Sequence, residues 1–102
     1  MHTISAARLR ELAEPLAALS LSHLTPATRQ KLLENELSVN AYPTEYGGFV
    51  FVGTPCHRRP AENDLASIFD TAEQAGVAWL FFDAEAPLLE GLPVFTAAQP
   101  SG

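Results

Sequence analysis

An amphipathic helix followed at once by an apolar strand constrains the fold of this chain more than any other feature. Within residues 61–75, apolar side chains recur at i, i+3, i+4 and i+7, the spacing that places them on one side of a helix. They are Leu65, Ile68, Phe69 and Ala72. Gly76 then supplies the left-handed residue that commonly ends a helix. Residues 77–82 are all apolar, which is typical of a central, buried strand.

Shorter elements are predicted before this pair. Residues 5–14 have helical spacing, and Pro15 should end that helix because proline lacks the N–H that a helix interior needs. Residues 19–24 alternate between apolar and polar side chains, as a short half-buried strand does. Thr25 as N-cap and Pro26 in the first turn predict the start of a second helix.

A hairpin is predicted in the middle of the chain. Residues 37–42 alternate and residues 49–52 are rich in β-formers, while 43–48 have the composition of a turn. A short edge strand is predicted at 92–95. The element order α-β-α-β-β-α-β predicts an α+β fold, with one antiparallel or mixed sheet of three to five strands and helices packed on one side.

The length of the chain predicts a single domain over residues 1–102. We expect residues 1–17 to form a loosely packed N-terminal helix, 18–96 to form the core and 97–102 to form a flexible tail. Residues 1–16 contain no continuous apolar run, so no signal peptide is predicted. No other stretch is long and apolar enough for a membrane span.

Charge is distributed unevenly along the chain. Up to Arg59, six basic side chains face five acidic ones; beyond it there are seven acidic side chains and no lysine, arginine or histidine. A negative second half should repel bare nucleic acid and anionic lipid and attract basic protein surfaces. We therefore predict a protein partner with a basic surface, and neither direct nucleic-acid binding nor membrane binding. The predicted partner-binding residues are Asp70, Glu73, Asp83, Glu85 and Glu90.

Neither a cofactor nor a metal is predicted. The lone Cys56 cannot form an internal disulfide, which fits a reducing cytoplasm. The histidines and Cys56 do not have the close spacing of a zinc motif. His23, at the end of a predicted strand, is expected to form a local hydrogen bond.

Two features leave an enzymatic alternative open. Cys56 and His57 adjoin two arginines, a setting that can lower a thiol pKa and favour nucleophilic chemistry. Asp83 and Glu85 are two residues apart at the end of a strand and could act as an acid–base pair. Neither feature has an orienting partner in the sequence, so a solvated loop and a turn are the favoured interpretations. A small hydrolase or thiol enzyme stays the second alternative.

Five aromatic residues fall in the predicted strands, namely Phe49, Phe51, Trp79, Phe81 and Phe82. Such residues can form a stacking platform for RNA bases. That use also needs basic side chains beside the rings, and here the strand leads directly into acidic residues. Core packing is therefore the favoured interpretation.

Three stretches resemble an uncharacterised family of small bacterial proteins found on plasmids, prophages and integrative elements. The stretches are residues 20–25 (SLSHLT), 46–52 (YGGFVFV) and 79–95. The last matches the family pattern at Trp79, Asp83, Pro87, Gly91, Leu92, Pro93 and Phe95. It departs from that pattern at Ala86 and Ala97, where glycine and an aromatic residue are usual. The resemblance implies a mobile-element setting and no particular chemistry.

Together these features predict a small acidic, non-catalytic, cytoplasmic protein that binds another protein. In a mobile-element setting it could be an inhibitor of host defence, anti-CRISPR-like, that blocks a basic nucleic-acid-binding surface. The alternative is a homodimeric structural or regulatory protein that pairs through the strand at 49–52 as a sheet edge.

Overall fold

The computed structural model describes residues 2–95, so the predicted flexible tail at 97–102 lies outside the described residues. The elements are α1 (His2–Leu12), β1 (Leu16–Ser20), a 3₁₀ turn η1 (Leu21–His23), α2 (Pro26–Leu33), β2 (Ala41–Thr44), β3 (Gly47–Phe51), α3 (Asn63–Ala75) and β4 (Trp79–Asp83). Apart from the 3₁₀ turn, this order is the predicted one. The α+β fold is confirmed.

The four strands form one mixed sheet in the order β1-β4-β3-β2. β1 runs parallel to β4, whereas β4 with β3 and β3 with β2 pair in antiparallel fashion. β4 is therefore a central strand, as its apolar sequence predicts. β3 is also central, so it cannot serve as the sheet edge of a homodimer; the edges are β1 and β2.

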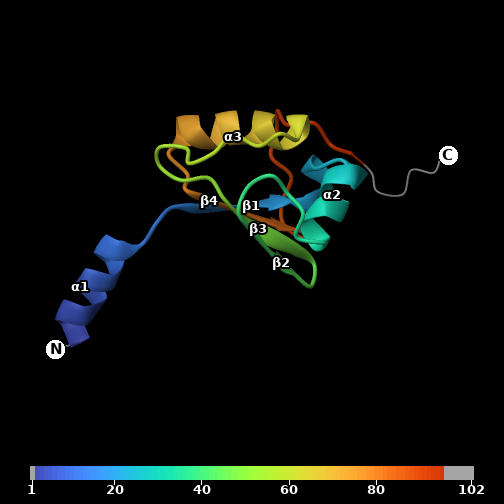
Figure 1. Cartoon of the computed structure of the whole chain (residues 1–102). Helices are drawn as coiled ribbons and strands as arrows, with labels where there is room; N and C mark the ends of the chain where they lie inside the picture. Colours follow the sequence, from blue (N-terminus) through green and yellow to red (C-terminus); the bar gives the residue numbers. More distant parts are fainter. Residues whose placement is uncertain (1, 96–102) are drawn as a thin grey trace.

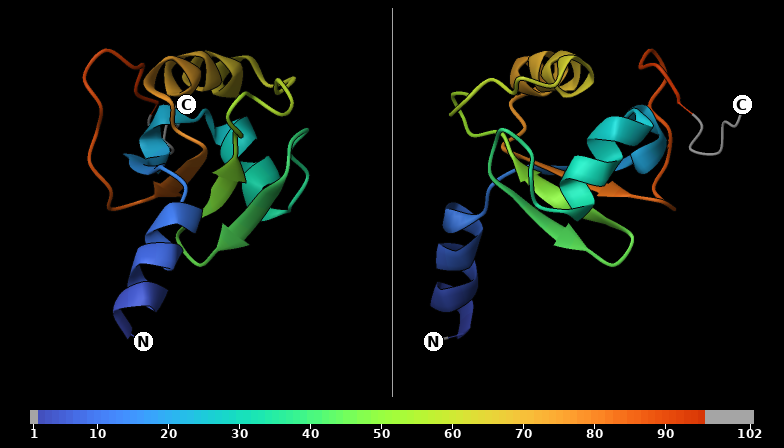
Figure 2. Two further views of the ribbon diagram at one scale, coloured as in Figure 1. Left: turned by 90° about the vertical axis from the view of Figure 1, so that its left-hand side faces the viewer. Right: turned by 45° about the vertical axis from the view of Figure 1, so that its right-hand side comes forward.

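The helices α2 and α3 lie on one side of the sheet, and α1 projects from the opposite side, away from the body (Figure 1). The turned views in Figure 2 show the same arrangement, with α3 above the sheet and α1 below it. The core lies between the sheet and the two packed helices. Its most completely buried large side chains are Leu24, Leu32, Val50, Val52, Leu65, Phe69, Leu80 and Phe82.

Local sequence signals explain where α2 begins and where α3 ends. Thr25 caps α2, because its hydroxyl accepts a hydrogen bond from the Thr28 N–H at 3.3 Å. Gly76 ends α3 with φ +74°, in the predicted left-handed conformation. Both signals act within a few residues, which is why the sequence reveals them.

The largest differences from the predicted strand boundaries are in β1 and β2. β1 begins at Leu16 and ends at Ser20, where the serine hydroxyl accepts the Ser22 N–H and starts the 3₁₀ turn. The alternating pattern at 19–24 therefore marks a strand end and a turn. β2 begins only at Ala41, so residues 37–40 lead into the sheet as a loop.

The hairpin turn is tighter than predicted, because only Glu45 and Tyr46 separate the two strands. Pro43 lies within β2, where an edge strand tolerates a residue that cannot donate a hydrogen bond. Gly47 is required by close packing, since a Cβ atom there would lie 1.8 Å from the Phe82 carbonyl oxygen. The edge strand predicted at 92–95 is wrong; that stretch is irregular and is held by other contacts, described below.

Candidate functional site: an open aromatic sheet face

The sheet has one covered face and one open face. In β4, Leu80 and Phe82 point into the core while Trp79 and Phe81 alternate to the other side and stay half-buried. In β3, Phe49 and Phe51 also lie half-buried opposite them. The prediction that all five aromatic residues pack in the core is therefore wrong for four of them.

The aromatic rings contact one another across the strands. Phe49 and Phe81 are stacked, with ring centroids 4.5 Å apart, and Phe51 and Trp79 are tilted at 4.9 Å. Tyr42 on β2 lies 6.1 Å from Trp79 and is 56% exposed. These distances are within the range of favourable aromatic pairs, so the rings hold each other in fixed positions.

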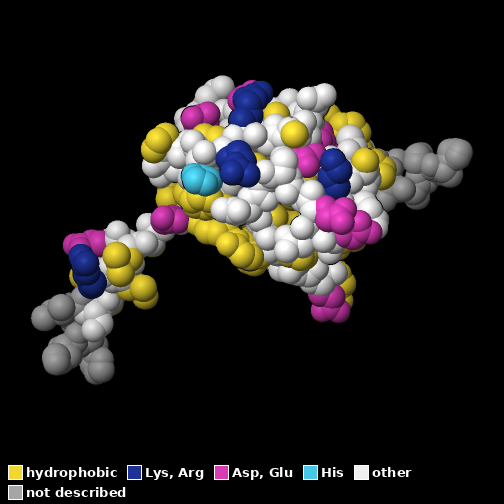
Figure 3. Space-filling model, in the orientation of Figure 1, with side chains coloured by type: hydrophobic (Ala, Val, Ile, Leu, Met, Phe, Trp, Pro, Cys, Tyr) yellow, Lys and Arg dark blue, Asp and Glu magenta, His cyan; other side chains and the backbone are white. Residues whose placement is uncertain are grey.

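The apolar surface continues onto β1. Leu16 pairs in register with Trp79, and Ala18 pairs with Phe81, and both β1 side chains are exposed. A band of hydrophobic side chains accordingly runs along the underside of the body in Figure 3. We call this surface the open aromatic face; it consists of Leu16, Ala18, Tyr42, Phe49, Phe51, Trp79 and Phe81. Parallel strand pairs are usually covered on both faces, so the open side of β1 and β4 is a candidate contact surface.

Acidic groups flank the open aromatic face. Glu14 accepts a hydrogen bond from the indole Nε1–H of Trp79 at 2.8 Å. By strand alternation, Asp83 follows Trp79 and Phe81 on the same side of β4. Three cations have partners away from this face: Lys31 pairs with Glu62, Arg59 with Asp70, and Arg29 donates to the Leu24 and Phe95 carbonyls. The charged groups named here at the border of the open aromatic face are therefore acidic.

The five predicted partner-binding residues occupy two parts of the fold. Asp70 and Glu73 are exposed on α3, while Asp83, Glu85 and Glu90 lie at the end of β4 and beyond it. Acidic and basic side chains are interspersed on the face seen in Figure 3.

Asp70 is engaged in an ion pair. The Arg59 guanidinium hydrogen-bonds to the Asp70 carboxylate, which lowers the pKa of Asp70 and raises that of Arg59. Glu73, Glu85 and Glu90 are the more accessible acidic groups. Arg59, from the loop before α3, therefore offsets the charge of Asp70.

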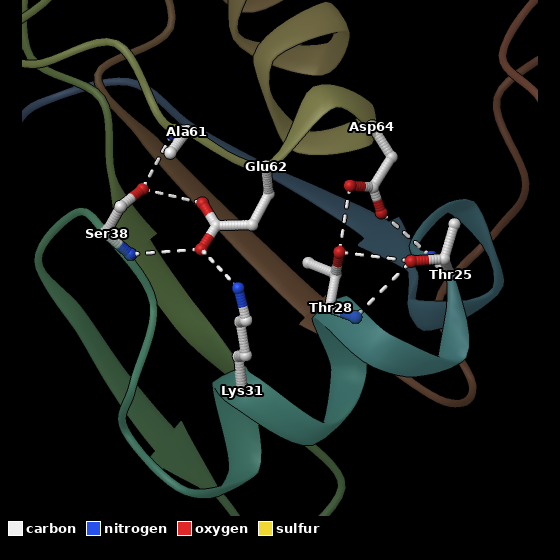
Figure 4. Close-up of polar contacts among 7 residues, drawn as sticks. All are labelled: Thr25, Thr28, Lys31, Ser38, Ala61, Glu62 and Asp64. Atoms are coloured by element: carbon white, nitrogen blue, oxygen red, sulfur yellow. Dashed lines mark hydrogen bonds and ion pairs between the residues drawn. The ribbon is translucent and has the colours of Figure 1, made fainter.

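Two other acids of the second half stabilise the fold (Figure 4). Asp64 accepts hydrogen bonds from the Thr25 N–H at 2.9 Å and the Thr28 hydroxyl at 2.8 Å, which joins the first turns of α3 and α2. Glu62 accepts the Ser38 hydroxyl at 2.6 Å and its N–H at 3.2 Å, and lies 3.7 Å from Lys31. The acidic surplus is therefore partly structural.

The pKa of Glu62 reflects opposing causes. Burial raises the pKa, but the hydrogen bonds from Ser38 and the backbone, together with the charge of Lys31, outweigh it, so the pKa lies below the ordinary value of 4.5. Glu62 is consequently ionised at neutral pH, although its side chain is only 6% exposed.

The candidate catalytic groups have other contacts in the fold. Cys56 packs half-buried against the hydrophobic core. The neighbouring imidazole of His57 lies 6.0 Å from the Phe51 ring, at the end of the open aromatic face. The Asp83 carboxylate accepts the Glu85 N–H at 2.8 Å and so closes a turn. Across the described residues, no three His, Cys, Asp or Glu side chains gather as a metal site would require.

His23 connects two distant parts of the chain, which corrects the prediction of a local hydrogen bond. Its ring is 1% exposed; Nε2 accepts the Leu89 N–H at 2.9 Å and Nδ1 lies 2.8 Å from the Pro93 carbonyl oxygen. Because a carbonyl only accepts, Nδ1 carries the proton. Nearby, the Phe95 N–H donates to the Ser22 carbonyl at 2.6 Å. These bonds hold the C-terminal segment, residues 84–95, against the body.

A comparison with protein families identifies the domain. A model described as "Family of unknown function (DUF5983) C-terminal domain" matches residues 16–97. The chain belongs to this family. No curated protein and no solved structure matches it.

The start of the DUF5983 match coincides with the start of a strand. It begins at Leu16, the first residue of β1, and includes the whole sheet, α2 and α3. The helix α1 precedes the matched region. Among residues 2–95, no helix of this DUF5983 protein is long and apolar enough to cross a membrane.

Proposed function

We propose that this DUF5983 protein is a non-catalytic module that binds another protein through the open aromatic face. The observation that carries the proposal is the continuous aromatic and aliphatic surface that is left exposed or half-buried across all four strands of the sheet. Aromatic residues dominate the energetics of protein interfaces, because they bury a large area and lose little conformational freedom. The neighbouring acids favour a partner with basic groups around an apolar centre.

A non-catalytic role is supported by the contacts of the candidate catalytic groups. A nucleophile needs a base and an orienting group within hydrogen-bond reach. Cys56 packs against the core, and Asp83 is used in a turn. We propose a cytoplasmic location, because a single cysteine suits a reducing compartment.

A narrower proposal follows from the mobile-element resemblance. The protein would be an anti-CRISPR-like inhibitor of host defence that occupies a basic nucleic-acid-binding surface. Exposed Glu73, Glu85 and Glu90 support an electrostatic contribution to such a contact. Asp70 would contribute less, since Arg59 already offsets its charge.

The test is capture of binding proteins, a second copy included, with the whole chain as bait. Phe81→Thr keeps a β-forming residue and removes one ring from the open aromatic face. Leu33→Thr is the matched control, because Leu33 is 51% exposed on α2. We expect Phe81→Thr to weaken binding at least tenfold and Leu33→Thr to leave it unchanged.

The competing outcomes are separable. If Phe81→Thr retains every bound protein, the open aromatic face is not the contact surface. If instead a triple variant, Glu73→Gln with Glu85→Gln and Glu90→Gln, loses binding that Phe81→Thr retains, contact is electrostatic and lies elsewhere. A folded Phe81→Thr variant, shown by an unchanged circular dichroism spectrum, is required for either conclusion.

A further inference from the structure

The helix α1 is exposed to solvent at residues 5–12. It stands away from the body, on the side of the sheet opposite α3 (Figures 1 and 2). Leu9 and Leu12 are three residues apart, so they share one side of the helix, and they are 69% and 61% exposed. A helix of 11 residues is marginal by itself in water, so packing must supply its stability.

The dimensions of α1 fit the open aromatic face. At about 1.5 Å per residue, α1 is about 16 Å long. A five-residue strand such as β4 has nearly the same length, about 17 Å. The usual cover of a parallel strand pair is a helix, and among residues 2–95 no helix covers the open side of β1 and β4.

The charges of the two surfaces are complementary. Arg8 and Arg10 flank Leu9 on either side of the helix. Arg8 pairs with Glu11 at 3.2 Å, so the surplus positive charge of α1 is that of Arg10. Glu14 and Asp83 lie at the borders of the open aromatic face. A helix laid across this face would bring its basic groups toward these acids, which favours α1 over a second aromatic sheet as the occupant.

The connection to β1 directs α1 away from the face of its own chain. The Pro15 carbonyl accepts hydrogen bonds from the Ala78 and Trp79 N–H groups, at 3.0 and 3.1 Å. Glu14 is held by the Trp79 indole. Folding α1 back on its own sheet would disturb these bonds, whereas reaching a neighbouring molecule would not.

We infer that the open aromatic face is covered by α1 of a second copy of this chain, in a two-fold symmetric, arm-exchanged dimer. The inference rests on the proposed function and names its partner. In such a dimer each chain donates one helix and accepts one, so both exposed apolar surfaces are buried at once. Leu16 would join them, because only residues 13–15 separate it from α1 and it pairs in register with Trp79.

The oligomeric state is the first test. Sedimentation equilibrium of the whole chain at several concentrations should show a dimer. Leu9→Glu should weaken dimerisation at least tenfold, because it places a charge in the buried seam. Ala7→Glu is the matched control: it adds the same charge on the opposite side of α1 and should have little effect. A chain that is monomeric at every concentration overturns the inference.

The occupant is identified by isotope-filtered NOE measurements on an equal mixture of labelled and unlabelled chains. We expect contacts between copies, from the Leu9 and Leu12 methyl groups to the rings of Trp79 and Phe81. Contacts only within one chain, or only between the two sheets, would overturn the inference. Capture of a different protein that depends on Phe81 but tolerates Leu9→Glu would preserve the proposed function while refuting the dimer.

Discussion

The bond network between Ser38 and Glu62 gives a quantitative prediction for the substitution Ser38→Ala. The Ser38 hydroxyl donates to Glu62 Oε1 at 2.6 Å and accepts the Ala61 N–H at 2.8 Å. A hydrogen bond to a charged group contributes about 1.5–3 kcal/mol to stability. The Ala61 N–H is on an exposed residue, where water can replace the hydroxyl, so it adds little. We expect Ser38→Ala to cost about 2 kcal/mol at neutral pH.

The cost should depend on pH in a defined direction. Because the pKa of Glu62 is lowered in the folded state, its ionised form stabilises the fold fully above the ordinary value of 4.5. That contribution is lost as the pH falls through the folded-state pKa. Removing the Ser38 hydroxyl raises the pKa of Glu62, so the difference in stability between wild type and variant should shrink in acid.

Urea denaturation followed by far-UV circular dichroism measures this difference. It should be about 2 kcal/mol near pH 7 and should become smaller at a pH well below 4.5, as Glu62 is protonated. Ser67→Ala, at an exposed position of α3, is the control and should change stability by less than about 0.5 kcal/mol at both pH values. An equal loss for Ser38→Ala at both pH values would refute the reasoning, since the lost bond would then not depend on the Glu62 charge.

Four further outcomes are expected. His23→Leu leaves two backbone groups of the C-terminal segment without partners, so it should cost about 2 kcal/mol and speed amide hydrogen exchange in that segment. Gly47→Ala should cost more than about 3 kcal/mol by urea denaturation, because its Cβ would meet the Phe82 carbonyl. Gly91→Ala, with nothing within 4 Å but φ +100°, should cost about 1 kcal/mol. Cys56→Ser should leave protein capture unchanged; loss of capture in a folded variant would favour the thiol alternative.

Local signals in the sequence determined much of the fold. The apolar spacing of residues 61–75, the stop at Gly76 and the cap at Thr25 are each recognised within one or two helical turns. The cap and the stop involve only neighbours a few residues away, so they can be recognised without the tertiary structure. The element order and the central position of β4 follow from the same short-range patterns.

Strand boundaries and the contacts of His23 needed the folded chain. The alternating pattern at residues 19–24 predicts a strand. In the structure the strand ends at Ser20, whose hydroxyl caps the following turn. His23 finds its two partners in the C-terminal segment, far away in sequence. Such a long-range contact produces no periodic pattern in the sequence, because only the folded chain brings the partners together.

The open aromatic face was decided by tertiary structure alone. Residues 77–82 are apolar throughout, so their period of two is hidden and the sequence does not say which side of β4 faces water. That choice depends on where α2 and α3 pack, since no helix in the described part of the chain covers the other side of β1 and β4. The sequence determined that the second half is acidic. The fold decided that Glu62, Asp64 and Asp70 form hydrogen bonds and ion pairs within the chain. Which charges are buried or paired depends on the folded structure, whereas the composition gives only the net charge.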